Sequence, residues 1–168
     1  MQIKPGLPAM WRLHQRKLLL IIVAVMAVTG ITVLVDSQNK AYLIETYKRL
    51  DKKDFEIQSS GVSNGNLKEI VGQIYCGPQL DKALAYFKEL SSKSLCLKLD
   101  SVKYNDIKVL QQARSSATLL VDSSYSGSFV TAEKGEMMRK LAVNTLCQVE
   151  LAKDGNEWKI SEVVVLKD

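Results

Sequence analysis

The sequence predicts an α+β fold preceded by a single transmembrane helix, and three observations lead to this class. Residues 18–35 form an uncharged run of eighteen residues. Apolar residues then recur at helical spacing up to about residue 91. From residue 95 onward the apolar period changes to two, which is the period of β-strands. Helices followed by hairpin-connected strands favour an antiparallel sheet with helices on one face.

Residues 18–35 are predicted to anchor the chain in a membrane. At about 1.5 Å per helical residue the run is roughly 27 Å long, close to the hydrocarbon thickness of a bilayer. No acidic residue precedes Asp36, so the positive-inside rule favours a cytoplasmic or stromal N-terminus. The flank combines four basic residues with one aromatic residue at headgroup level: Lys4, Arg12, Arg16, Lys17 and Trp11.

The anchor divides the chain into three parts. Residues 1–17 form a basic cytoplasmic tail, residues 18–35 the transmembrane helix, and residues 36–168 one extracytoplasmic domain in a periplasm or an organelle lumen. The rival interpretation is a secretory signal cleaved after Val25-Met26-Ala27. Because apolar residues continue from Ile31 to Val35, an uncleaved signal-anchor is favoured.

The formal net charge of +5 follows from this topology. All 18 acidic residues lie at or beyond Asp36, where they nearly balance the remaining basic residues. A nucleic-acid surface needs a basic stripe interleaved with aromatic residues, and the charges of residues 36–168 are mixed in sign. We therefore expect no nucleic-acid partner.

The helical half contains three predicted segments. The first spans residues 38–50. The second begins at Asn66, which forms a capping box with Glu69, and it ends at Gly77-Pro78. The third spans about residues 79–91. Their apolar faces are expected in the core: Leu43, Tyr47 and Leu50; Leu67, Ile70, Val71, Ile74 and Tyr75; Leu80, Leu84, Phe87 and Leu90.

Four alternating segments follow as predicted strands. The first begins at Leu95 and changes parity near Asp100-Ser101, which indicates a β-bulge. The second alternates over residues 117–125 and the third over residues 141–151. Asp154-Gly155 is a strong hairpin signal, and it leads into a last strand that contains Trp158, Ile160, Val164 and Leu166.

Three short motifs between Gly77 and Leu166 match one pattern. They are Gly77-Pro78-Gln79-Leu80 after a helix, Leu99-Asp100-Ser101-Val102 in a strand, and a closing hairpin from Gly155 to Leu166 with Trp158-Lys159-Ile160. The pattern resembles the intermembrane-space domain of chloroplast and cyanobacterial division proteins, within the NTF2-like (cystatin-like) superfamily. The resemblance covers roughly residues 66–168.

This resemblance implies an NTF2-like cone of helices packed on a curved antiparallel sheet. It also implies a membrane-anchored domain that binds another protein across the membrane. The plan of a short cytoplasmic tail, one helix and such a domain is similar, too, to the bitopic inner-membrane component of type IV secretion systems.

Catalysis is not expected. The only histidine, His14, lies in the basic tail, so residues 36–168 have no imidazole for a nucleophile pair or for the usual zinc sites. The strand acids Asp100, Asp122 and Glu150 lie out of phase with their apolar neighbours, and we expect them on a solvated face. No catalytic, cofactor-binding or metal-ligating residue is assigned, and no cofactor is expected.

Two residue pairs are candidates for a disulfide and for a partner contact. Cys96 and Cys147 lie in predicted strands, and a bridge between them requires that these strands be neighbours. The alternative is that both, with Cys76, are small core residues. Phe129 and Val130 lie in a predicted loop from Ser126 to Ala132; exposed, they would contact a partner, and tucked in, they would close the cone.

The sequence therefore predicts a single-pass membrane protein whose extracytoplasmic domain binds a protein partner as an assembly, anchoring or scaffold subunit, with a homodimer left open. The alternative is a tethered pocket domain that binds or converts a small apolar molecule. An interior filled by residues such as Leu141, Val143 and Trp158 favours the scaffold. An open pocket on the order of several hundred Å³ with one convergent carboxylate favours the ligand site.

Overall fold

The computed structural model describes residues 36–60 and 66–167 of the 168-residue chain. The chain divides into a unit that ends at Ala41 and a unit that begins at Tyr42. In the first unit, residues 36–41 are helical, and Lys40 Nζ pairs with Asp36 Oδ2 at 2.6 Å. The contacts described below belong to the second unit.

The predicted anchor lies outside the described residues. This applies to residues 18–35 and to the flanking Lys4, Trp11, Arg12, Arg16 and Lys17. Among residues 36–60 and 66–167, no helix is both long enough and apolar enough to cross a membrane. The three-part division of the chain therefore stays a prediction.

The second unit is α+β, as the sequence predicts. Its first helix ends at residue 60; α2 spans Leu67–Val71 and α3 spans Gly77–Ser92. The strands that follow are β1 (Leu95–Gln112), β2 (Ser116–Thr131), β3 (Met137–Asp154) and β4 (Glu157–Lys167). They form one antiparallel sheet in the order β1-β2-β3-β4.

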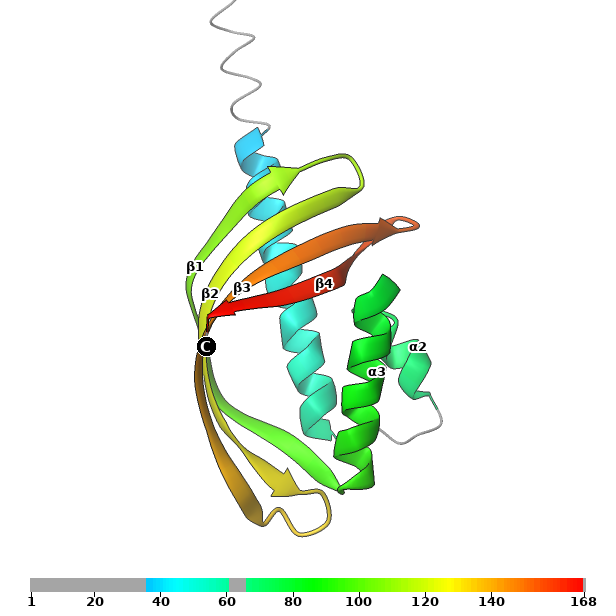
Figure 1. Cartoon of the computed structure of the whole chain (residues 1–168), viewed down its shortest axis with the longest axis vertical. Coiled ribbons are helices and arrows are strands. Elements are labelled where there is room, and N and C mark those ends of the chain that lie inside the picture. The colour runs from blue at the N-terminus through cyan, green and yellow to red at the C-terminus, as the bar shows by residue number, and fades with distance from the viewer. Residues whose placement is uncertain (1–35, 61–65, 168) are drawn as a thin grey trace, which may run out of the picture. The chain divides into compact units, whose positions relative to one another are not determined.

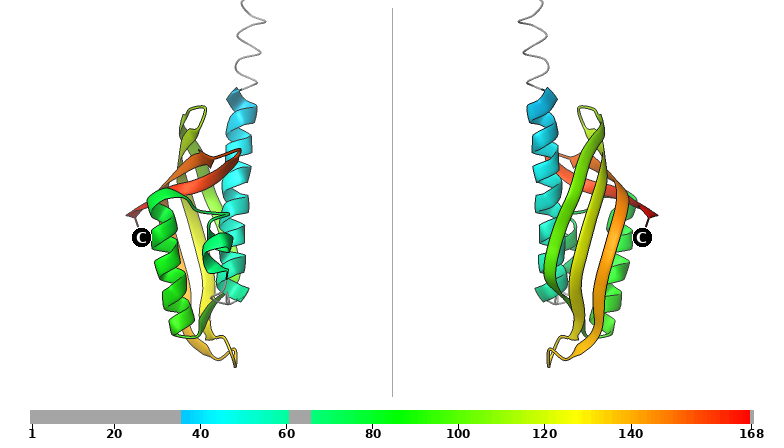
Figure 2. Two further views of the ribbon diagram at one scale, coloured as in Figure 1. Left: turned by 90° about the vertical axis from the view of Figure 1, so that its right-hand side faces the viewer. Right: turned by 90° about the vertical axis from the view of Figure 1, so that its left-hand side faces the viewer.

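The sheet curves around the helices (Figure 1). Figure 2 shows that the helix ending at residue 60 and α3 lie over the same, concave face, and that no helix of the described residues covers the convex face. The period-two pattern produces these two faces, because Ala117, Leu119 and Val121 are buried toward the helices whereas Thr118 and Leu120 are only half-buried.

The main core lies between the sheet and the helix that ends at residue 60. Its buried members are Leu43, Tyr47, Leu50, Ile74, Ala117, Leu119, Val121, Val149, Leu151, Trp158 and Ile160. A smaller cluster joins α2 to α3 and consists of Leu67, Val71, Ala83 and Phe87. Burial of apolar area at about 25 cal/mol per Å² is the main term that holds these layers together.

The Gly77-Pro78 step begins a helix, whereas the sequence pattern predicts that it ends one. Gly77 has a φ of +55°, which a glycine adopts without strain. Pro78 lies in the first turn of α3, where its missing N–H leaves no hydrogen bond unmade. Asn66 is the N-cap residue of α2, yet its side chain makes no capping hydrogen bond. The predicted capping box with Glu69 is therefore wrong.

The segment between α2 and α3 pairs with the sheet. Cys76 N donates to the Ile160 carbonyl at 3.0 Å, and Ile160 N donates to the Ile74 carbonyl at 2.8 Å. These bonds form a short parallel bridge centred on Tyr75 and Ile160. The segment therefore covers the outer edge of β4 around Ile160.

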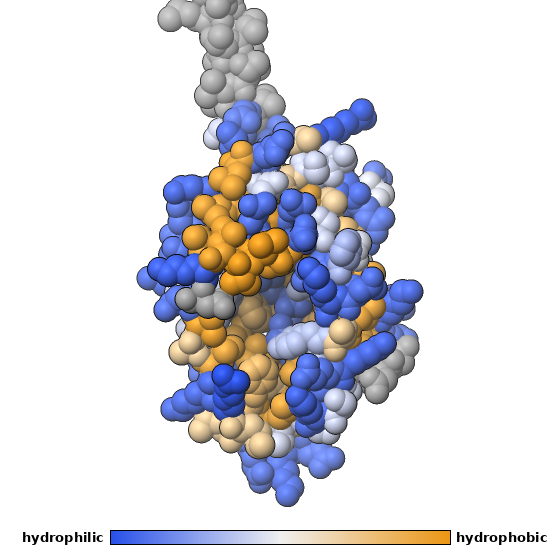
Figure 3. All heavy atoms as spheres, in the orientation of Figure 1, coloured by the Kyte–Doolittle hydropathy of each residue, from blue (hydrophilic) through white to orange (hydrophobic). Residues whose placement is uncertain are grey.

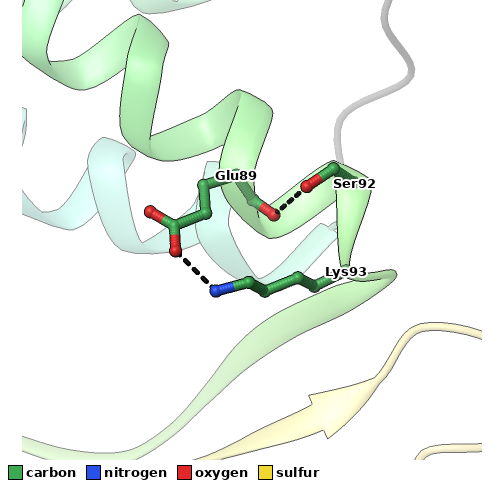
Figure 4. Close-up of polar contacts among 3 residues, drawn as sticks. All are labelled: Glu89, Ser92 and Lys93. Atoms are coloured by element: carbon green, nitrogen blue, oxygen red, sulfur yellow. Dashed lines mark hydrogen bonds and ion pairs between the residues drawn. The ribbon is translucent and has the colours of Figure 1, made fainter.

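Local polar contacts mark the end of α3 (Figure 4). Ser92 Oγ donates to the Glu89 carbonyl at 2.8 Å, and Lys93 Nζ pairs with the Glu89 carboxylate at 2.5 Å. A cation at this end also interacts favourably with the helix dipole. Ser94 then adopts a φ of +49° and leads into β1.

Residues 126–131, predicted as a loop, are part of β2. Serine and glycine are typical of turns, but Gly127 instead permits a close approach between strands. A Cβ atom added there would lie 2.4 Å from the Lys98 carbonyl oxygen and 3.0 Å from Leu99 Cα. The register shifts between Leu99 and Ser101 at the same place, which confirms the predicted bulge.

Gly127→Ala is expected to destabilise the fold by about 1–3 kcal/mol, because the added Cβ overlaps the backbone of β1. Guanidinium unfolding of the variant measures this change. Ser128→Ala, at the next and half-buried position, is the matched control and should shift stability by less than about 0.5 kcal/mol. Equal stability of the two variants would contradict the close approach.

Candidate functional site

One face of the first described helix carries polar groups into the interior. Leu43, Tyr47, Leu50 and Asp54 lie at positions i, i+4, i+7 and i+11, and all four are buried. Asp51 lies on the same face. The periodicity that predicts the first three as core residues therefore continues into two aspartates. Because the predicted helix stops at residue 50, the sequence analysis missed both of them.

Tyrosine hydroxyls hold the Asp51 carboxylate. The hydroxyl of Tyr104, on β1, donates a hydrogen bond of 2.6 Å to Asp51 Oδ2, and the Tyr47 hydroxyl interacts with the same carboxylate. Burial raises the pKa of Asp51 to about 6; the Tyr104 hydrogen bond lowers it, and the charge of Asp54 raises it further. Asp51 is therefore a carboxyl group that titrates close to neutral pH.

Neutral donors likewise hold the Asp54 carboxylate. Gln58 Nε2 donates to Asp54 Oδ2 at 2.5 Å, and Gln58 Oε1 accepts a hydrogen bond of 3.0 Å from Tyr86. Burial raises the pKa of Asp54, while hydrogen bonds from Tyr75 and Gln58 lower it. Among the described residues neither Asp51 nor Asp54 forms an ion pair.

Aromatic rings surround the two carboxylates. Tyr47 meets Tyr104 edge to face, with ring centroids 6.2 Å apart, and Tyr125 packs on Phe55 at 5.2 Å. The Tyr125 hydroxyl accepts a hydrogen bond of 2.8 Å from Ser123 Oγ. Burial raises the pKa of Tyr125 to about 12, and it also raises the pKa of Tyr47 and of Tyr104. These phenols are therefore uncharged donors at neutral pH.

A cavity of about 320 Å³ opens beside this cluster. Asp51 is the only charged side chain among the described residues that line it. Gln79, from the first turn of α3, also lines the cavity, and its buried Oε1 has no hydrogen-bond partner in the described part of the chain. The remaining wall is aromatic and apolar, with two hydroxyls and one thiol: Tyr47, Phe55, Tyr75, Val121, Ser123, Tyr125, Leu141, Val143, Thr145, Cys147, Val149, Ile160 and Val163.

The interior beside the sheet is therefore not completely filled by side chains. Leu141 and Val143 line the cavity. Trp158 is buried in the main core without lining the cavity, and Lys153 Nζ lies 5.3 Å from its ring centroid. An open interior with one convergent carboxylate is the arrangement that favours a ligand site.

The other sequence candidates lie away from the cavity. Asp100 is exposed, and Asp122 and Glu150 are half-buried outside the lining. Phe129 and Val130 are half-buried within β2, where Phe129 pairs with Leu97 and Arg139. Their role as a partner contact stays a prediction.

The possible Cys96–Cys147 disulfide is not present in the described residues. None of the three cysteines forms a disulfide, and β2 separates the two strands on which Cys96 and Cys147 lie. Cys96 pairs with Val130 and Cys147 with Val121. These β2 positions are separated by roughly 30 Å along the strand at about 3.3 Å per residue, whereas a disulfide needs Cα atoms about 4.4–6.8 Å apart.

Comparison with known proteins identifies a similar fold. The sequence matches no protein-family model and no curated protein. The structure is similar to the intermembrane-space region of the chloroplast protein ARC6, with a TM-score of 0.55 and 17% identity over 74% of this chain and 96% of that chain. This chain shares the fold of that region. The resemblance predicted from the sequence motifs is thereby confirmed, and at this identity it concerns the fold alone.

A second solved structure, a de novo designed β-sheet protein, aligns at a TM-score of 0.36 and 15% identity over 76% of this chain and 90% of that chain. A likeness at this level carries no argument about fold or function.

Asp51→Asn is expected to stabilise the protein at pH 7.5 by about 1–3 kcal/mol. Because burial raises the pKa of Asp51 from 3.8 to about 6, the folded state binds the proton more tightly than the unfolded state. Stability from the protonated carboxyl group is complete below pH 3.8 and is lost as the pH rises through 6. Denaturant unfolding at pH 3.5 and pH 7.5 measures the difference between wild type and variant.

The exposed Asp100→Asn is the control for this measurement and should shift stability by less than about 0.5 kcal/mol at pH 7.5. If Asp51→Asn changes the stability equally at both pH values, burial does not raise the pKa of Asp51 in the folded state.

Proposed function

We propose that the chain is a single-pass membrane protein whose extracytoplasmic domain binds a protein partner as an assembly, anchoring or scaffold subunit of a membrane complex. The proposal includes the anchor over residues 18–35, an NTF2-like cone for the domain, a periplasmic or lumenal location and a non-catalytic role. The observation that carries it is the exposed apolar end of the edge strand β4.

The C-terminal half of β4 presents apolar side chains to solvent. Val164, Val165 and Leu166 are 43%, 52% and 52% exposed. Figure 3 shows apolar side chains gathered on the face of the molecule that β4 crosses in Figure 1. A contiguous exposed apolar surface is typical of an interaction site.

The same half of β4 has an open backbone edge. β4 is the last strand in the sheet order, and in the described residues its bonds to the segment between α2 and α3 involve Ile160 alone. Open N–H and C=O groups on an edge are a template for an added strand. Between Ser161 and Leu166 the only charged residue is Glu162, so little charge opposes such pairing. A partner strand would satisfy the backbone groups and cover the valines and the leucine.

The fold likeness supports the proposed location. The region of ARC6 that shares this fold lies in the intermembrane space, and we propose the corresponding periplasmic or lumenal side for residues 36–168. An anchor next to such a domain fixes its orientation and raises its effective concentration near a partner in the same membrane.

Val165→Lys is expected to reduce recovery of the partner at least about tenfold, because a lysine on an edge strand opposes strand addition. The measurement is the native mass of the full chain after gentle detergent extraction, with the co-purifying chains identified. The wild-type chain should be recovered in a stoichiometric complex.

The matched control is Leu110→Lys. Leu110 is 56% exposed on β1, the opposite edge strand of the sheet, and this variant should keep the partner. Recovery of the wild-type chain as a lone monomer or homodimer would contradict the proposed function, and equal loss in both variants would contradict the assignment to β4.

A further inference from the structure

The interior of the domain holds two carboxyl groups that have no positive counterpart among the described residues. Asp51 and Asp54 are bound by neutral hydroxyl and amide groups, and in the described part of the chain no lysine or arginine pairs with either. A buried carboxylate without a counter-charge is costly, and proteins normally pair it. A bound cation would therefore supply the counter-charge that the described residues do not provide.

The cavity gives such a cation access to Asp51. Its volume of about 320 Å³ lies at the lower end of the range for small-molecule pockets. Asp51 lines the cavity, whereas Asp54 does not. Tyr75 lines the cavity as well and hydrogen-bonds Asp54. A ligand in the cavity would therefore meet one carboxylate directly.

A second acceptor in the wall independently indicates a ligand. The Gln79 side chain lines the same cavity as Asp51, and its buried Oε1 has no hydrogen-bond partner among the described residues. An unsatisfied buried carbonyl is unfavourable by about 1–3 kcal/mol, and an N–H donor from a bound molecule would remove this penalty. A positively charged group that carries an N–H would pair with the Asp51 carboxylate and also donate a hydrogen bond to Gln79.

The composition of the wall indicates what the rest of the ligand is. Tyr47, Phe55, Tyr75 and Tyr125 line the cavity, and aromatic faces attract cations by cation–π interaction. The apolar side chains that β3 contributes suit a hydrocarbon body. Among the described residues no group of three or more His, Cys, Asp or Glu side chains gathers to hold a metal ion, so the donor set suits an organic cation better.

We propose that this cavity binds a small organic ammonium ion with an apolar body, which pairs with Asp51 and donates an N–H to Gln79 Oε1. The aromatic side chains surround the charged end, and the apolar part lies against β3. This site is separate from the partner surface on β4, since Val164, Val165 and Leu166 do not line the cavity.

The test compares two probes of nearly the same shape, benzylamine and benzyl alcohol, by calorimetric titration of the detergent-solubilised full chain at pH 7.5. Benzylamine is expected to bind at least about tenfold more tightly, because it alone carries the charge. Equal affinities would overturn the preference for a cation, and failure of both probes to bind would overturn the cavity as a site.

Two variants test whether Asp51 and Gln79 cause the preference for benzylamine over benzyl alcohol. Asp51→Asn should remove the preference for benzylamine while leaving the affinity for benzyl alcohol, and Gln79→Met, which keeps the length of the side chain, should weaken benzylamine binding several-fold. Asp100→Asn and Val165→Lys are controls that should leave both affinities unchanged. A preference that persists in Asp51→Asn would overturn the proposal, whatever the outcome of partner recovery.

Discussion

The hydrogen bond between Tyr104 and Asp51 joins two residues that are 53 positions apart in the chain, and it represents the constraint on which the rest of the domain depends. One helix face must fit the concave side of a curved sheet while it carries both leucines and aspartates. The leucines provide the apolar burial. The aspartates can be accommodated only because tyrosines and a glutamine supply hydrogen bonds to them. The cavity lies beside this mixed face, with Asp51 in its wall.

Much of the sheet could be predicted because it depends on a simple period. The alternation over residues 117–125 identifies the buried face of β2. Asp154-Gly155 identifies the β3–β4 hairpin, in which Asp154 ends β3 and Gly155 begins the turn with a φ of +63°. The parity change near Asp100-Ser101 identifies the bulge. Each of these signals is local, so neighbouring residues contain the information.

The failures concern residues whose role is set by distant parts of the chain. Gly127 looks like a turn residue, but its role is to let Lys98 and Leu99 approach on the next strand. Gly77-Pro78 looks like a helix stop because glycine ends helices more often than it begins them. Asp51 and Asp54 lie in the charged stretch Asp51-Lys52-Lys53-Asp54. By sequence alone, such a stretch is typical of a solvated surface. Only the tyrosines of the sheet and of the loop before α3 make the two aspartates interior residues.

The short bridge between Tyr75 and Ile160 has a consequence for how this domain can assemble. It occupies the outer edge of β4 at Ile160, so a strand added to β4 would pair with the residues that follow Ile160. Long edges that stay open are the usual starting point for indefinite sheet growth. By closing part of this edge, the domain shortens the stretch of β4 that is available for sheet growth.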